Sequence, residues 1–216
     1  MSAAERAGTL VLLAKEPVPG RVKTRLHAAF RPDEAARLAA AAIDDTLAAL
    51  VAAPARRRLV ALDGDAGAWV PPGFDVVRQP TGGLGDRLAA AFDAALADPR
   101  DGPALLVGMD TPQLAGPLAA VDFHGVDAVL GPTDDGGYWA IGLRAPDPRV
   151  FAGVPMSTDG TCAAQLARLR DLGLRVGLLP RLRDVDEPDD ARAVAALAPH
   201  TRFAAAYHDL APVHTR

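Results

Sequence analysis

A short basic loop follows the first apolar segment of the chain. Residues 9–13, TLVLL, have the continuous apolar character of a strand buried on both faces of a parallel sheet. Pro17, Pro19 and Gly20 shape the loop, because proline fixes φ and glycine permits conformations that other residues avoid. The loop carries four cationic residues: Lys15, Arg21, Lys23 and Arg25. Because open α/β sheets bind ligands at the carboxyl ends of their strands, we interpret this loop as an anion site, most commonly a phosphate site.

The distribution of lysine supports this interpretation. The chain has 23 lysines and arginines, yet its two lysines both lie in this loop, and arginine fills every other basic position. A compact ammonium on a flexible stem does not bind as a planar guanidinium does. The structural alternative is a solvated basic turn, and we favour the functional interpretation.

Carboxylates follow later apolar segments in the same way. They are Asp110, Asp135, Asp184 and Asp186. The first two come after apolar runs, and the last two flank Val185 in an extended segment, so their side chains should share one face. Cations suited to a polyphosphate and carboxylates suited to Mg²⁺ or Mn²⁺, at one edge of a sheet, suggest metal-assisted transfer at phosphate.

Each carboxylate also has a structural alternative. Asp110 precedes Thr-Pro and could cap a helix. Asp134 and Asp135 precede two glycines and could form only a hairpin turn. Asp186 precedes Glu-Pro, which fits a helix start with acids near the positive end of its dipole. These alternatives stay open at the level of the sequence.

The segments that must position these residues alternate between strand and helix. Strands are expected at 8–14, 58–62, 75–78, 104–107, 127–130, 138–143 and 174–178. Helices are expected at 32–51, 86–97, from 113, at 160–172 and up to 197. This alternation predicts an α/β protein with a parallel, doubly wound sheet. The glycine-rich loop at 82–85 leads into a helix with Asp86 as its expected N-cap, and it could face a ligand with its backbone.

Length and composition set further bounds. At 216 residues the chain is expected to form a single domain over residues 1–216, with a core at about 8–197 and an extension at 198–216 that is loosely held from Pro199. The net charge of −4 argues against a nucleic-acid or membrane-surface binder. Cys162 is the single cysteine, which excludes an intramolecular disulfide and a cysteine metal cluster. The polar N-terminus and the lack of an apolar run of about 20 residues predict a cytoplasmic protein.

Other chemistries fit the sequence poorly. The loop around Lys23 lacks the glycine that a Walker A motif places before its lysine, and no dinucleotide-binding G-x-G-x-x-G follows the first strand. No G-x-S-x-G nucleophile motif is present either. The sequence thus favours a phosphate site of another kind.

Five short motifs together resemble a known family. They are AKEPVPGRVKTRL, QPTGGLGDRL, VGMDTPQL, LGPTDDGGYWAIGL and RDVDEPDD. In this order, over about residues 8–197, the chain resembles a GT-A-like family labelled glycosyltransferase or nucleotide-diphospho-sugar transferase. More distantly it resembles the 2-phospholactate and molybdenum-cofactor guanylyltransferases. The resemblance implies a GT-A fold, with a mostly parallel mixed sheet and helices on both of its faces.

The resemblance also implies roles for individual residues. Lys23, Arg25 and Asp110 would be catalytic, and Asp110, Asp186 and, as a competitor, Asp184 would bind Mg²⁺ or Mn²⁺. The residues implied for nucleotide binding are Ala14, Lys15, Pro19, Gly20, Arg21, Lys23, Gly82, Gly83, Leu84, Gly85 and Asp86. Those expected to shape the acceptor pocket are Thr133, Asp134, Asp135, Gly136, Gly137 and Tyr138.

The function predicted from these features is that of an enzyme, a Mg²⁺-dependent nucleotidyltransferase. It would transfer an NMP from an NTP to a small phosphorylated acceptor and release pyrophosphate. The first alternative is a glycosyltransferase that uses an NDP-sugar, and the second is a non-catalytic module that binds a nucleotide or a partner. The expected partners are the nucleotide and a small-molecule acceptor, without nucleic acid or membrane, and a homodimer is left open.

Overall fold

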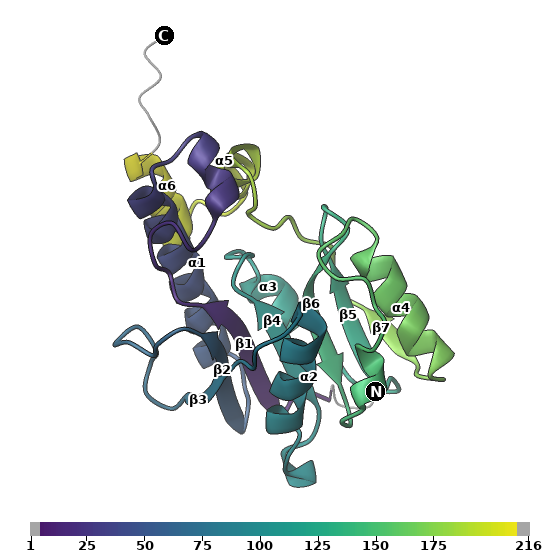
Figure 1. Ribbon diagram of the computed structural model, residues 1–216. Helices are drawn as coiled ribbons and strands as arrows, with labels where there is room; N and C mark the ends of the chain where they lie inside the picture. The colour runs from purple at the N-terminus through teal and green to yellow at the C-terminus, as the bar shows by residue number, and fades with distance from the viewer. Residues whose placement is uncertain (1–4, 211–216) are drawn as a thin grey trace.

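One mixed sheet organises the computed structural model, which describes residues 5–210 (Figure 1). Within that range seven strands pair in the order β3-β2-β1-β4-β6-β5-β7. Their bounds are β1 Thr9–Lys15, β2 Arg57–Asp63, β3 Asp75–Arg78, β4 Ala104–Gly108, β5 Ala128–Pro132, β6 Tyr138–Leu143 and β7 Val176–Leu178. The prediction of a mostly parallel mixed sheet in an α/β protein is confirmed.

β6 is the strand whose direction departs from the parallel pattern. It runs antiparallel to both β4 and β5, whereas β1 is parallel to β2 and β4, and β5 is parallel to β7. The connection from β5 to β6 is the turn at 133–137, which is too short for the crossover that parallel strands need. The fully parallel sheet expected from alternation is therefore wrong at β6, and the hairpin alternative for Asp134 and Asp135 is correct.

Helices cover both faces of the sheet. Their bounds are α1 Pro32–Ala52, α2 Leu84–Ala95, α3 Ala115–Ala119, α4 Thr161–Asp171, α5 Pro188–Leu197 and α6 Arg202–Leu210, and short 3₁₀ turns are η1 Thr24–Ala28, η2 Pro99–Asp101 and η3 Pro148–Val150. On one face, Ile43 of α1 and Leu118 of α3 share a core cluster with Leu12 of β1. On the other face, Phe92 of α2 and Leu169 of α4 pack with strand residues. The strands are therefore buried from both sides, as their apolar sequences predict.

The C-terminal helices form a third cluster on the outer side of α1. Phe203 of α6 is 1% exposed and packs with Leu38 of α1 and Val194 of α5. Figure 1 shows α6 lying beside α1 and α5. The expectation of a loosely held end from Pro199 is wrong for residues 202–210, because the apolar face of α6 adds to this core. His214 lies outside the described residues.

Phe203→Ala is expected to lower the free energy of unfolding by about 3–5 kcal/mol, since it leaves a cavity where a fully buried ring packed. Denaturant unfolding followed by circular dichroism would measure this loss. Leu197→Ala on the neighbouring helix is the control: its side chain is 67% exposed, so the change should stay within about 0.5 kcal/mol. Equal stabilities for the two variants would contradict the packing of α6.

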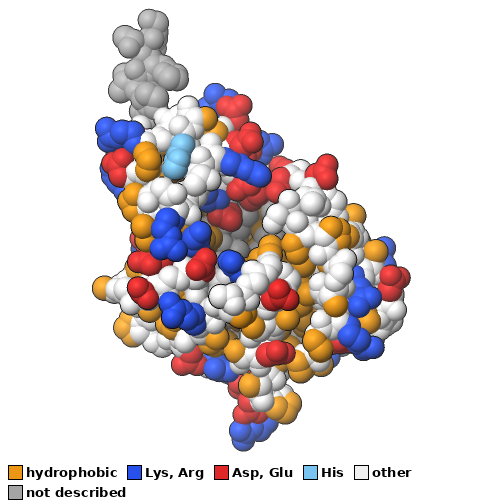
Figure 2. Space-filling model, in the orientation of Figure 1, with side chains coloured by type: hydrophobic (Ala, Val, Ile, Leu, Met, Phe, Trp, Pro, Cys, Tyr) orange, Lys and Arg blue, Asp and Glu red, His pale blue; other side chains and the backbone are white. Residues whose placement is uncertain are grey.

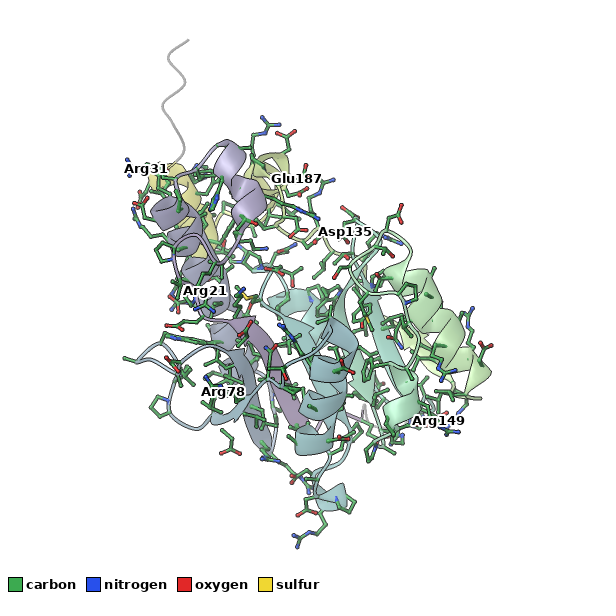
Figure 3. The ribbon with its side chains drawn as sticks, viewed as in Figure 1. Arg21, Arg31, Arg78, Asp135, Arg149 and Glu187 are labelled. Carbon is green, nitrogen blue, oxygen red and sulfur yellow. The ribbon has the colours of Figure 1, made fainter. Side chains whose placement is uncertain are left out.

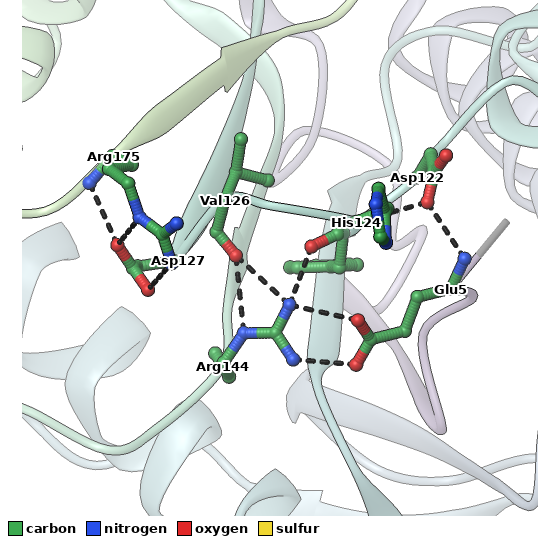
Figure 4. A network of polar contacts seen from close by, with 8 residues as sticks. Glu5, Asp122, His124, Val126, Asp127, Arg144 and Arg175 are labelled. Atoms are coloured by element: carbon green, nitrogen blue, oxygen red, sulfur yellow. Dashed lines mark hydrogen bonds and ion pairs between the residues drawn. The ribbon is translucent and has the colours of Figure 1, made fainter. Parts of the chain in front are cut away.

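An ion-pair network closes the sheet edge where β5 and β7 begin and β6 ends (Figure 4). The Arg144 guanidinium donates to both carboxylate oxygens of Glu5 and to the Phe123 and Val126 carbonyls. Hydrogen bonds from the Arg175 side chain and backbone hold the pKa of Asp127 down, at about 2. These charged groups are satisfied by one another, and we assign them a structural role at the edge opposite the candidate site.

Candidate active site

The candidate site lies where β1, β4 and β5 end and β6 begins. Two segments distant in sequence meet there: the basic loop after β1 and the extended segment 182–186 before α5. The extended segment is tied down at both ends. The Asp134 N–H donates to the Leu182 carbonyl at 3.0 Å, and the Val185 N–H donates to the Asp110 carbonyl at 2.9 Å. Figure 2 shows acidic side chains around a hollow in this region.

Lys23 is the most deeply placed cation of the basic loop. Its side chain is 7% exposed, and its ammonium contacts the Asp110 carboxylate, the Val185 carbonyl and, at 3.5 Å, the Asp186 carboxylate. Its backbone adopts a left-handed conformation, with φ 49°, which turns the chain into η1. Burial alone would lower the pKa of Lys23, but the carboxylates of Asp110 and Asp186 outweigh it and raise that pKa. Lys23 is thus a charged group held among acids.

The other loop cations line a shallow basic hollow of about 300 Å³. Lys15 and Arg21 lie there, and among the described residues neither side chain has an ion-pair partner. Arg25 pairs with Asp186 at 3.1 Å from the same hollow. In Figure 3, Arg21 and Asp135 come from the two sides of the upper sheet edge, and Glu187 lies at the start of α5 above them. The predicted loop residues Pro19 and Gly20 are exposed and do not line this hollow.

Three carboxylates converge on the other side of Lys23. Oxygens of Asp135, Asp184 and Asp186 lie within 4.8 Å of one another. Val185 is buried between the two C-terminal acids, so Asp184 and Asp186 share a face, as their alternation predicts. Asp135 comes from the β5–β6 turn, where its Oδ1 accepts hydrogen bonds from the Thr133 hydroxyl and the Gly137 N–H.

This acid cluster differs from the predicted ligand set in one member. Asp110 pairs with Lys23 and is not one of the three, whereas Asp135, assigned to the acceptor pocket from the sequence, is. Asp110 does not cap a helix either, because α3 begins at Ala115 with Leu114 before it. Asp110 still lines the same cavity as the cluster. No sequence signal separated Asp135 from Asp134, since the choice depends on which side the turn faces.

The donor set fits a hard divalent cation. Three carboxylates offer anionic oxygens of the kind that Mg²⁺ and Mn²⁺ bind. The electrostatics agree: burial raises the pKa of Asp184 to about 7, with added repulsion from Asp135, Asp186 and Asp110. A cation among these groups would relieve that repulsion, so the residues present fit a metal.

The crowding of Asp184 predicts a pH effect on stability in the presence of a chelator. A carboxyl whose pKa is raised from 3.8 to about 7 by folding binds its proton more tightly in the folded state. Its contribution to stability is therefore full below about pH 4 and is lost as the pH rises through 7. We expect the thermal midpoint of the chelated protein to fall between pH 5 and pH 8, and to fall less in Asp184→Asn. Parallel pH profiles for the two proteins would contradict this.

The glycine-rich loop at 82–85 precedes α2. The helix begins at Leu84 with Gly83 as its N-cap, so the expected N-cap Asp86 is wrong; its carboxylate instead accepts from the Gly83 N–H at 3.0 Å. Gly82 has φ 136°, which only glycine adopts readily. Leu84 lines two cavities at the site, while the three glycines and Asp86 line neither of them.

A cavity of about 270 Å³ lies between the ends of β1 and β4 and the start of α2. Gln79 lines it, and its amide nitrogen donates to the carbonyls of Ala14 at 2.9 Å and Ala61 at 2.8 Å. Arg87 lines it too, within 3.4 Å of Asp63. The sequence reasoning missed Gln79 and Arg87, although both adjoin the glycine-rich loop. The predicted Ala14 takes part through its carbonyl, and Lys15 joins this cavity to the basic hollow.

The largest cavity at the site, about 540 Å³, extends from the acid cluster to the start of α4. Of the predicted acceptor residues, Thr133, Asp135, Gly137 and Tyr138 line it. Asp134 and Gly136 do not: the first pairs with Arg183, and the second packs against the Asp159 backbone. The lining residues that sequence reasoning missed are Thr111, Trp139, Ser157, Thr158, Asp159 and Thr161.

The fold defines a class before any function is assigned. The chain is similar to a protein from Desulfovibrio desulfuricans G20 that is provisionally named a nucleotide-diphospho-sugar transferase, with 27% identity, 95% of each chain covered and a TM-score of 0.84. It is also similar in fold to the inositol-1-phosphate CTP transferase of T. maritima (11% identity, 97% and 100% covered, TM-score 0.56). The 2-C-methyl-D-erythritol 4-phosphate cytidylyltransferase of Thermus thermophilus is a further match in fold (18%, 90% and 100%, 0.52).

These similarities confirm the predicted nucleotide-diphospho-sugar transferase fold and agree with the prediction of a transferase. A family model described as "Uncharacterized protein conserved in bacteria (DUF2064)" matches residues 24–158, and the protein belongs to this family. No curated protein matches the chain. In residues 5–210 none of the helices has both the length and the apolar character needed to cross a bilayer. The predicted cytoplasmic location stays a prediction.

Proposed function

We propose that the protein is a divalent-metal-dependent transferase that binds a nucleotide donor between the basic hollow and the acid cluster. The observation that carries this proposal is that the two meet at one residue. The Asp186 carboxylate belongs to the acid cluster and also pairs with Arg25 of the hollow at 3.1 Å. Cations for phosphate oxygens and carboxylates for a metal therefore adjoin.

The reaction proposed first is transfer of an NMP from an NTP to a small acceptor with release of pyrophosphate. Lys15, Arg21 and Arg25 would bind the β- and γ-phosphates, because the hollow that they line opens beside the cluster. Asp135, Asp184 and Asp186 would hold Mg²⁺ or Mn²⁺, which when bound supplies charge neutralisation at the reacting phosphate. The cavity lined by Gln79 would receive the nucleoside.

Lys23 has a different part in this proposal from the phosphate contact predicted for it. Its ammonium compensates Asp110 and fixes the Val185 carbonyl, so it holds the extended segment against the basic loop. We propose that it positions the cluster, while its charge still adds to the potential that the phosphates meet.

A second candidate is a glycosyltransferase that uses an NDP-sugar. The observation that favours it is the similarity, at 27% identity, to a protein named for nucleotide-diphospho-sugars. The same metal and phosphate sites serve both reactions, but the bond broken differs. Release of pyrophosphate from an NTP identifies the first reaction, and release of NDP from a nucleotide sugar identifies the second.

The test is a thermal-shift screen of the four NTPs and a set of NDP-sugars, with and without Mg²⁺. A ligand at 100 times its Kd adds about 2.7 kcal/mol of stability if it binds only the folded state. We expect an NTP to raise the midpoint with Mg²⁺ and to raise it less without the metal. If neither donor class binds, the proposed function fails; if one binds without turnover under any acceptor, a non-catalytic module is the remaining interpretation.

A further inference from the structure

The charge of the largest cavity bears on what the acceptor is. Five of its lining residues are acids: Asp110, Asp135, Asp159, Asp184 and Asp186. Arg25 is the single cation among the lining residues, and it already pairs with Asp186. The nearby Arg181 and Arg183 do not line the cavity, since the first donates to the Thr133 carbonyl and the second pairs with Asp134. No lining cation is left to receive an anionic acceptor.

Bound metal and donor do not reverse this balance. A divalent cation offsets two of the charges in the acid cluster, and Lys23 offsets Asp110. The donor phosphates then add negative charge beside them. A phosphorylated acceptor would bring a further dianion into a partly desolvated site of like charge, which is unfavourable by several kcal/mol at the low effective dielectric of such sites, an order of magnitude only.

The remaining lining groups are hydroxyls. They belong to Thr111, Thr133, Ser157, Thr158 and Thr161. Thr111 is 1% exposed, and within the described residues its hydroxyl oxygen has no hydrogen-bond partner, an uncommon condition for a buried polar group. Thr158 contributes only a long contact of 3.4 Å to the Thr161 hydroxyl. Each of these oxygens both donates and accepts, and the carboxylates accept, so the wall suits a ligand that carries several hydroxyls.

We propose that the acceptor is a neutral, polyhydroxylated molecule of the sugar or polyol class. The inference rests on the proposed nucleotidyl transfer and replaces the phosphorylated acceptor expected from the sequence. An acceptor hydroxyl oxygen forms the new bond to the α-phosphorus, the bond from that phosphorus to the β-phosphate oxygen breaks, pyrophosphate leaves, and the hydroxyl proton passes to solvent. Asp159, whose carboxylate has no partner in residues 5–210, would bind a second acceptor hydroxyl.

The test uses the full chain with Mg²⁺ and the non-hydrolysable analogue of whichever NTP stabilises it, so that the basic hollow is filled. Saturation-transfer NMR then compares glycerol, glucose and inositol with their monophosphates, and with glucosamine. We expect signals from the neutral compounds and not from the monophosphates. Preferential binding of the monophosphates, binding of the amine alone, or no binding of any neutral compound would overturn the inference. If no NTP binds at all, the proposed function fails and the inference falls with it.

Variants at Asp159 sharpen the result. Asp159→Asn should weaken the best neutral ligand about tenfold, because a hydrogen bond to a charged group is replaced by one to a neutral amide. Asp159→Arg should let the monophosphates bind, while nucleotide affinity stays unchanged. Asp171→Asn, at the far end of α4 and outside the cavity, is the matched control and should change nothing. Unchanged selectivity in Asp159→Arg would count against the electrostatic argument.

Discussion

Lys23→Met is expected to lower the free energy of unfolding by about 3 kcal/mol, the lower end of the range for breaking a buried ion pair. The variant keeps much of the apolar stem but removes the ammonium that lies against Asp110 and Asp186. The lower end applies because the Asp110 side chain is 41% exposed, and solvent screens the charge left behind. Denaturant unfolding in the absence of divalent cations measures the loss.

Lys15→Met is the matched control, since it changes the other lysine of the chain on the same loop. Its ammonium has no ion-pair partner among the described residues, so the variant should unfold within about 0.5 kcal/mol of the parent. Lys15→Met should instead weaken NTP binding. If Lys23→Met kept full stability and lost only nucleotide affinity, Lys23 would be a phosphate ligand and its positioning role would be refuted.

Asp135→Asn is expected to reduce turnover by about 100-fold or more, since a metal supplies several kcal/mol of transition-state stabilisation and each 1.36 kcal/mol is a factor of ten. The amide oxygen can still accept from the Thr133 hydroxyl and the Gly137 N–H, so the turn keeps its shape while the charge is lost. The Mg²⁺-dependent part of the thermal shift should fall with turnover.

The neighbouring residue provides the control for this prediction. Asp134→Asn removes one charge from the same turn, but the Asp134 carboxylate pairs with Arg183 at 3.3 Å and lies outside the acid cluster. We expect this variant to keep turnover within a few-fold of the parent. Equal losses in the two variants would mean that the turn acts through net charge rather than through a ligand at Asp135.

The sequence predicted the framework of this site well, because strand patterns carry that information. The strands expected at 58–62 and 104–107 are observed as β2 and β4, each with one further residue at one or both ends. The carboxyl ends of parallel strands meet at one edge, so the meeting of the basic loop with Asp110 and Asp186 followed from topology. The alternation around Val185 also predicted which acids share a face.

The details that the sequence did not reveal depend on tertiary contacts. Whether Lys23 faces phosphate or the carboxylates is decided by its left-handed backbone and by the position of the Val185 carbonyl, 162 residues away. The choice between Asp134 and Asp135 depends on the pairing of β5 with β6. The loop at 157–159 carries no motif, and only its packing against the turn at Gly136 brings it to the cavity.

The shared position of Asp186 has a thermodynamic consequence. Its carboxylate pairs with Arg25 and also belongs to the group of acids suited to a metal. A cation that draws on this carboxylate frees Arg25 for an anion, so occupancy of one subsite changes the affinity of the other. Linkage requires this influence to be mutual and equal in size: whatever factor Mg²⁺ contributes to the affinity for nucleotide, nucleotide contributes to the affinity for Mg²⁺.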